Sequence, residues 1–230
     1  MLTLEKGEPL ALAVTEAIQT GDVDMLRSLL EEHPGLATSR IVDERRCGRS
    51  LLHVATDFPG LYPQRVQTLQ LLLAAGADIN VRFVGFHSET PLHWAASNDD
   101  VAMVEALLEA GADIEADGGV IGNGTPLADA VAFGQWQAAR ALLSRGAQTT
   151  LWQAAALGLM DRLTIEATPD EITNAFWCAC HGGQREAAAF LLNHGAQLNW
   201  VGYDGLTPLQ AAERSQATEL VRWLRERGAQ

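Results

Sequence analysis

Apolar residues recur along the chain with the spacing of short amphipathic helices arranged in pairs. Leu92, Ala95 and Ala96 share one helical face, because residues three and four positions apart lie on the same side of an α-helix. Shortly afterwards, residues 101–110 read Val-Ala-Met-Val-Glu-Ala-Leu-Leu-Glu-Ala and predict a second helix that ends at Gly111. The pattern therefore predicts a unit made of helix, turn, helix and extended finger.

Each unit begins with a capping signature, which is most complete at residues 89–96, Glu-Thr-Pro-Leu-His-Trp-Ala-Ala. A threonine hydroxyl accepts hydrogen bonds from free amides at a helix start, and proline is tolerated at the first helical position. The glycines that end the second helices, Gly76, Gly111 and Gly146, recur at a constant interval of 35 residues. Repetition at this period indicates a stack of repeats in which each unit contacts mainly its neighbours.

The repeated motifs resemble those of the ankyrin-repeat family. Thr-Pro-Leu occurs at residues 90–92, 125–127 and 207–209, and each copy is followed, at the end of its second helix, by Gly-Ala. The resemblance covers roughly residues 10–230 and implies an all-α ankyrin-repeat solenoid of about seven helix-turn-helix units with β-turn fingers.

The repeat pattern also predicts the boundaries of the units. We expect an N-terminal tail at residues 1–9, followed by an ankyrin-repeat domain at residues 10–230. Its units are expected at residues 10–41 (cap), 42–82, 83–117, 118–150, 151–170 (short), 171–202 and 203–230 (cap). The fifth unit has no finger, and its second helix, expected at residues 160–166, stops early at Thr168-Pro169.

Composition narrows the function classes. Hydrophobic residues make up 47% of the chain, and the formal net charge of −13 argues against nucleic acid or an anionic membrane as a general partner. The three cysteines, Cys47, Cys178 and Cys180, lack a disulfide or metal spacing, so we expect a reducing cytoplasm. No apolar run approaches the ~20 residues of a membrane span, and the N-terminal residues do not resemble a leader.

Three of the six histidines lie in or beside the repeat signatures and fall into two groups. His53 and His93 hold the histidine position of the repeat signature, where we expect the imidazole to bridge backbone groups of neighbouring turns. His87 lies in an aromatic finger and is a candidate for ligand contact. Histidines and carboxylates do not share a metal-ligand spacing, so we expect neither a metal site nor a cofactor.

The family resemblance implies protein recognition through a concave surface, which is formed by the fingers and by the first helix of each helix pair. Helix spacing places Trp94, Asp129, Gln153 and Cys178 at successive positions on that surface. The expected binding residues are these positions, neighbours on the same faces, and residues of the flanking fingers: Phe86, His87, Trp94, Asn98, Asp129, Phe133, Gln153, Cys178, His181, Trp200, Tyr203 and Asp204.

Asp129 leaves two alternatives open. An unpaired, half-buried carboxylate destabilises by several kcal/mol or shifts its pKa, so Asp129 either anchors a partner or accepts a hydrogen bond from a finger amide. As an anchor, it would lie within an aromatic-rimmed cleft between Phe86, His87 and Trp94 on one side and Trp200 and Tyr203 on the other. Such a cleft suits a cationic side chain of a partner or a small ligand.

The alternative hypothesis is a small-molecule site or an enzyme in the cleft at the short fifth unit. Cys178 and His181 are three residues apart on a helix, so their Cβ atoms would lie ~5–6 Å apart, close enough for a thiol and an imidazole to meet. Asp129, two helices away, would lie near 20 Å from the thiol, given packing distances of about 8–10 Å. We therefore expect a non-enzymatic scaffold that binds a protein partner, with Cys178, His181 and Asp129 as weak catalytic candidates.

Overall fold

The structure, a computed structural model, describes residues 2–164 and 166–230. The chain forms two compact units, Met1–Ala147 and Gln148–Gln230. Each unit is built from the helix pairs that the repeat pattern predicts, and the expected mostly helical class is confirmed. Among the described residues, no helix is both long and apolar enough to cross a membrane.

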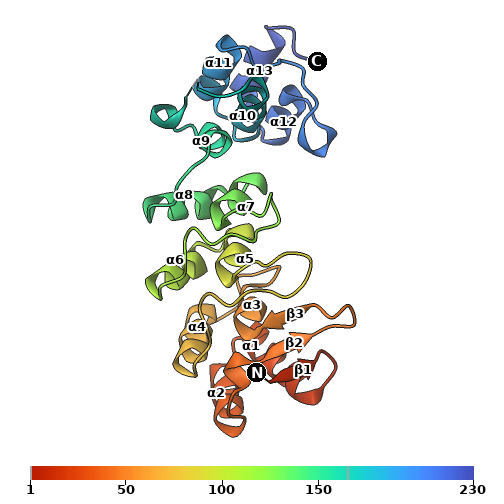
Figure 1. The fold of residues 1–230 in the computed structure, drawn as a ribbon, viewed down its shortest axis with the longest axis vertical. Helices are drawn as coiled ribbons and strands as arrows, with labels where there is room; N and C mark the ends of the chain where they lie inside the picture. Colours follow the sequence, from red (N-terminus) through yellow and green to blue (C-terminus); the bar gives the residue numbers. More distant parts are fainter. Residues whose placement is uncertain (1, 165) are drawn as a thin grey trace. The chain divides into compact units, whose positions relative to one another are not determined.

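The first unit contains four helix pairs in series (Figure 1). They are α1 (Pro9–Thr20) with α2 (Val23–Glu32), α3 (Leu51–Thr56) with α4 (Arg65–Ala74), α5 (Pro91–Ser97) with α6 (Val101–Glu109), and α7 (Pro126–Ala132) with α8 (Trp136–Ser144). The first helices pack side by side in the order α1, α3, α5, α7, and the second helices pack in the order α2, α4, α6, α8. A short 3₁₀ helix, η1 (Leu36–Thr38), follows α2.

The α5–α6 pair shows why the sequence folds this way locally. Thr90 caps α5 together with His93, and Asp100 caps α6 by accepting a hydrogen bond from the Met103 amide at 3.1 Å. Leu92 and its neighbours on the predicted apolar face are fully buried. Gly111, just beyond α6, has a φ of 91°, a backbone conformation that glycine adopts without strain.

A three-stranded sheet lies beside α1 and α3 in the first unit (Figure 1). Strand β1 (Thr3–Glu5) pairs in parallel with β2 (Arg40–Val42), which pairs antiparallel with β3 (Gly48–Ser50). Residues 1–9 were expected to form a tail, but residues 3–5 form a strand because Leu4 is buried opposite Ile41. Met1 lies outside the described residues.

The second unit is organised around its longest helix. Its elements are α9 (Leu151–Leu157), η2 (Met160–Arg162), α10 (Pro169–His181), α11 (Arg185–Asn193), η3 (Tyr203–Gly205), α12 (Pro208–Arg214) and α13 (Thr218–Arg225). Helix α10 packs against α9, α11 and α12 (Figure 1). The core includes Phe176, Cys180, Leu191 and Trp223, all at most 7% exposed.

The shortened, fingerless fifth unit is confirmed, but its predicted second helix is wrong. Only the 3₁₀ turn η2 forms within residues 160–166, and Ile165 lies outside the described residues. Thr168-Pro169 starts α10 instead of ending a helix, because Thr168 and Glu171 form a reciprocal capping box. Helix α10 therefore has 13 residues, against seven in α5, and the extra residues lie at its N-terminal end.

Candidate functional site

Asp129, on α7, is enclosed by the finger that precedes its own helix. Its side chain is fully buried, and Oδ1 accepts a hydrogen bond from the Ile121 amide at 3.1 Å. A Cβ at Gly119 would lie 2.9 Å from both carboxylate oxygens, so the finger backbone approaches the carboxylate closely because this residue is glycine. Of the two alternatives for Asp129, the structure shows the hydrogen bond to a finger amide, and the buried carboxylate is not offered to a partner.

Burial also changes the acidity of Asp129. It raises the pKa of the carboxyl from 3.8 to about 6, with a smaller contribution from the negative charge of Glu89. The hydrogen bonds from the Ile121 and Val120 amides act in the opposite direction, because they stabilise the ionised form. Asp129 is therefore a buried group of the fold that titrates near pH 6.

The two signature histidines bridge neighbouring repeats, as expected. His53 Nε2 donates to the Glu89 carbonyl at 3.0 Å, and His93 Nε2 donates to the Gly124 carbonyl at 3.1 Å. The Nδ1 atom of His93 accepts from the Thr90 amide at 3.1 Å, so one ring caps its own helix and holds the next finger. Burial lowers the pKa of His53 to about 3 and that of His93 to about 4, so both rings are neutral at pH 7.

The other predicted residues of the first unit differ in exposure. Phe86 and His87 are exposed in the finger of residues 81–90, and Phe133 is 47% exposed at the end of α7. Trp94 is half-buried and meets the His53 ring edge to face, with 4.9 Å between ring centroids. Asn98 is also half-buried, and its Nδ2 donates to the Thr56 carbonyl at 2.8 Å.

Three predicted residues of the second unit are buried. Gln153 is 3% exposed, and its Oε1 accepts from the Thr150 amide at 2.7 Å, so it caps α9 instead of lining a surface. Cys178 is 4% exposed, and burial raises the pKa of its thiol to about 12. His181 is 8% exposed and stacks on the Trp177 ring, with 5.6 Å between centroids. A thiol held in its neutral form is a poor nucleophile, so the raised pKa of Cys178 does not favour the pair of Cys178 and His181 as catalytic residues.

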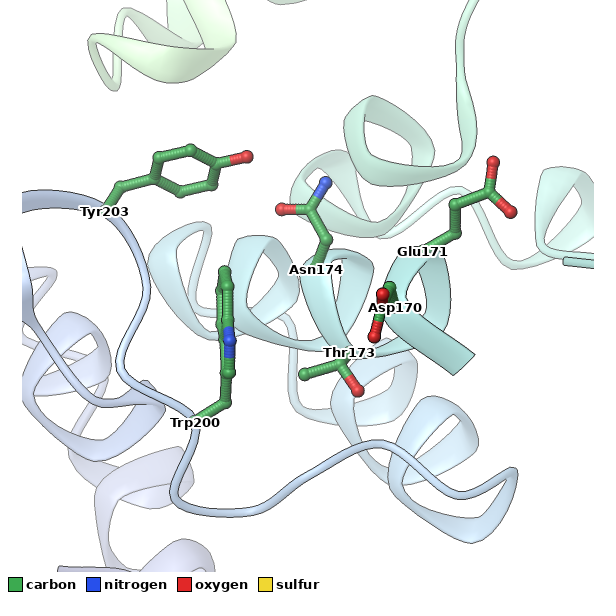
Figure 2. Close-up of a pocket in the computed structure, with 6 residues that line it drawn as sticks. All are labelled: Asp170, Glu171, Thr173, Asn174, Trp200 and Tyr203. Carbon is green, nitrogen blue, oxygen red and sulfur yellow. The ribbon is translucent and has the colours of Figure 1, made fainter. Parts of the chain in front are cut away.

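The remaining predicted residues, Trp200, Tyr203 and Asp204, lie in the last finger. Trp200 and Tyr203 line an open hollow of about 460 Å³ together with residues of the first turns of α10 (Figure 2). Asp204 pairs with Arg214 at 2.5 Å on the exposed surface. The predicted cleft that would join Asp129 to these aromatic residues draws on both units and stays a prediction.

Helix α10 and the last finger position the hollow between them. The finger is attached to α10 by Trp177, whose Nε1 donates to the Leu206 carbonyl at 2.8 Å, and by Thr173, whose Oγ1 accepts from the Gln197 amide at 3.3 Å. The α10 side of the hollow consists of Asp170, Glu171, Thr173 and Asn174.

These four α10 residues were not among the predicted binding residues, although the sequence contains a signal for the start of their helix. Thr168 followed three residues later by Glu171 is a capping-box sequence, which marks a helix start. Among the described residues, no group of three or more His, Cys, Asp and Glu side chains could hold a metal ion.

Comparisons with known proteins agree with the geometry of the repeats. A family described as "Ankyrin repeats (3 copies)" matches residues 65–151 and 151–230, and one described as "Ankyrin repeat" matches residues 47–82. Comparison with curated proteins gives no match. The crystal structure of the human ASB11 ankyrin repeat domain is similar, with a TM-score of 0.58 and 22% identity over 94% of this chain and 97% of that one. At this identity, the likeness concerns the fold alone.

Proposed function

Because the chain belongs to the ankyrin-repeat family, we propose that it binds a protein partner through exposed aromatic side chains of its first unit. Ankyrin repeats generally serve as scaffolds for protein–protein interactions. The observation that carries the proposal is Phe86, which is 84% exposed in the finger of residues 81–90. A large apolar side chain left in water is unfavourable in the free protein and becomes favourable when a partner covers it.

The finger that presents Phe86 is fixed at its base. The Phe83 amide donates to the Glu89 carbonyl at 2.8 Å, which closes the finger on itself. The Ser88 amide donates to the Gly118 carbonyl at 3.1 Å, which attaches it to the following finger. An aromatic side chain on a held backbone loses little conformational freedom on binding, a property of interface hot spots.

Two further aromatic residues extend the proposed surface along the first helices. Phe58, 80% exposed, follows α3, and Phe133, 47% exposed, follows α7. Both lie at the C-terminal ends of first helices, whereas Phe86 precedes the N-terminal end of α5. A seven-residue helix is about 10 Å long, so a partner lying along these helices can contact both ends.

Charge narrows the chemistry of the partner. Residues 1–147 contain ten lysines and arginines against twenty aspartates and glutamates, a difference of −10. A surface with this excess of acidic side chains repels acidic partners and attracts basic ones. We therefore propose a partner with a basic and apolar binding segment.

Affinity capture with matched variants tests the proposal. The bait is the full chain as wild type, as the double variant Phe86→Ala with Phe133→Ala, and as Met25→Ala. Met25 is 50% exposed on the second helix α2 and serves as the control. We expect a protein captured from the source lysate by wild type and Met25→Ala, and about tenfold less of it with the double variant. Equal capture by all three baits would contradict this surface.

We do not extend the proposal to catalysis. The Cys178 thiol is held in its neutral form, and Asp129 is enclosed by its own finger. For the compartment, we propose the cytoplasm, because Cys47, Cys178 and Cys180 are all free thiols, as a reducing environment favours. Cell fractionation that recovers the protein from an oxidising compartment would contradict this assignment.

A further inference from the structure

An aromatic corner forms one side of the hollow in the second unit. The rings of Trp200 and Tyr203 meet edge to face, with 6.2 Å between centroids and 86° between planes. Trp177 supports the Tyr203 ring from a second direction at 5.2 Å, and Asn174 hydrogen-bonds its side chain. Gly202 permits this packing, because a Cβ at that position would collide with both tryptophan rings. Tyr203 is thus held in place while 54% of it remains exposed.

The opposite side of the hollow is acidic and polar. Asp170 is exposed in the first turn of α10, and its carboxylate has no hydrogen-bond partner within residues 2–164 and 166–230. Glu171 also lines the hollow, although its carboxylate accepts hydrogen bonds from the Thr168 amide and hydroxyl, both at 2.8 Å. Thr173 and Asn174 add a hydroxyl and an amide. The described lining contains carboxylates and lacks a basic side chain.

The electrostatic balance favours a cation over an anion. A helix N-terminus carries a partial positive charge of roughly +0.5, which by itself would attract an anion. Two full negative charges, on Asp170 and Glu171, lie in the same turn and outweigh it. On the opposite side of the hollow, the rings of Trp200 and Tyr203 supply the ring electrostatics that attract a cation (Figure 2).

We propose that the hollow formed by Asp170, Asn174, Trp200 and Tyr203 takes an arginine side chain of a partner protein. This inference rests on the proposed function, since it assigns one chemical group to the protein partner. The guanidinium lies flat against an aromatic ring and donates to the Asp170 carboxylate. A volume of about 460 Å³ leaves room for the side chain to enter from the open side.

Arginine fits these groups better than the other cationic side chains. A methylated lysine is recognised by aromatic rings on several sides and does not need hydrogen-bond acceptors, whereas two aromatic residues and several acceptors line this hollow. An unmodified lysine ammonium is strongly hydrated and does not stack on a ring face. The planar guanidinium uses both features, an aromatic face and a carboxylate.

Titration of the full chain with small probes, followed by NMR of the tryptophan indole N–H signals, tests the site. The probe is N-acetyl-arginine amide, and the controls are the neutral citrulline analogue and the lysine and trimethyllysine analogues. Trp200→Phe assigns the Trp200 signal. We expect the arginine probe to shift that signal with a dissociation constant in the millimolar range, because a single side chain makes few contacts.

Matched variants then locate the interaction. We expect Tyr203→Ala and Asp170→Asn each to weaken the arginine probe about fivefold. Glu186→Gln is the control, because it also removes one carboxylate from the first turn of a helix, α11, which does not line the hollow. The Glu186→Gln variant is expected to bind as wild type does. Unchanged backbone amide signals away from the hollow in Asp170→Asn and Tyr203→Ala confirm that their folds are intact.

Four results would overturn the proposal. These are an unshifted Trp200 signal at saturating arginine, an equal shift with citrulline, tighter binding of trimethyllysine, and equal weakening by Glu186→Gln. The probe test is independent of the partner, so its failure leaves the capture experiment on Phe86 and Phe133 standing. Conversely, arginine binding that persists alongside equal capture by all baits would remove the first-unit surface and leave the hollow in place.

Discussion

The two units make the same inter-repeat hydrogen bond with different side chains. In the first unit, His93 lies four residues before the end of α5 and donates to the Gly124 carbonyl, just before the next Thr-Pro. In the second unit, Trp177 lies four residues before the end of α10 and donates to the Leu206 carbonyl, again just before Thr-Pro. The acceptor position is the same, although the donor has changed from an imidazole to an indole.

Helix length explains the difference. His93 has two tasks, because its Nδ1 accepts from the Thr90 amide at the start of α5 while Nε2 reaches the next finger. Helix α10 begins at Pro169, eight residues before Trp177, and its cap is formed by Thr168 and Glu171. A residue at the Trp177 position therefore needs only one donor, which an indole provides. The comparison teaches that the signature histidine performs both tasks in a short helix, because one imidazole caps α5 and also bridges to the next finger.

The largest effect is expected from His93→Ala. The change removes a buried ring, uncaps α5 and leaves the Gly124 carbonyl unpaired, so we expect a loss of about 3 kcal/mol in the free energy of unfolding. Urea denaturation at pH 7 measures it. His87→Ala, which removes an exposed histidine in the same unit, is the control and should change stability by less than about 0.5 kcal/mol. A similar cost for both variants would show that His93 is not a structural bridge.

The next largest effect is expected from acidification, which should lower the stability of the first unit more than that of the second. Because the pKa values of His53 and His93 are lowered to about 3 and about 4, the unfolded chain binds their protons first as pH falls through 6.5, and stability is lost. Asp129 has the opposite effect on stability. Its pKa is raised to about 6 in the folded protein, so the folded state binds this proton more readily than the unfolded chain as the pH falls. For these three groups together, we expect the first unit to lose roughly 2–3 kcal/mol of its free energy of unfolding between pH 7 and pH 5.

The indole of Trp177 does not titrate, so the bridge that it makes from α10 to the Leu206 carbonyl should persist over the same interval. Amide hydrogen exchange, corrected for intrinsic rates at each pH, measures protection in α5 and α10 within one sample. Equal losses of protection in both helices would contradict the contrast between imidazole and indole donors.

Trp177→Phe tests the indole bridge itself. The variant leaves the Leu206 carbonyl without its donor, so we expect a loss of about 1–2 kcal/mol beyond the effect of reduced size. Trp223→Phe provides the size control, because Trp223 is 7% exposed in the same core. Equal costs of the two substitutions in urea denaturation would mean that the hydrogen bond to Leu206 contributes nothing.

Asp129→Asn gives the smallest expected effect and isolates the opposing carboxylate. Between pH 5 and pH 7, wild type pays an increasing cost for ionising Asp129 in a buried site, whereas asparagine does not ionise. We therefore expect the stability of Asp129→Asn to rise relative to wild type by about 1.4 kcal/mol over this range, the value of one pKa unit. A constant difference between the two proteins across these pH values would refute the raised pKa.

The helix pairs could be predicted from sequence because their signals are local. Leu92, Ala95 and Ala96 define a buried face by spacing alone, and Gly111 marks a helix end. Strand β1 could not be predicted in this way, because its partner β2 lies 37 residues further along the chain, at Arg40 for Thr3. Local pattern thus determined the repeats, and pairing between distant segments determined the rest.

The candidate site was only partly predictable for the same reason. Trp200 and Tyr203 were recognised as aromatic finger residues. Asn174, which lines the hollow with them, was not, because its position depends on where α10 begins. Thr168-Pro169 carries both a start and a stop signal, since proline begins helices as readily as it ends them. The burial of Asp129 depends on how residues 118–124 fold over it, which spacing along α7 does not reveal.

The use of an indole donor in the second unit, where the first unit uses an imidazole, has a consequence for the whole chain under mild acid. Protonation weakens the imidazole bridges of the first unit, whereas the indole bridge of the second unit does not titrate, so acid should destabilise the two units to different extents. As the pH falls towards 5, the unfolding transitions of the two units are expected to move apart, and a single melting temperature would cease to describe the protein.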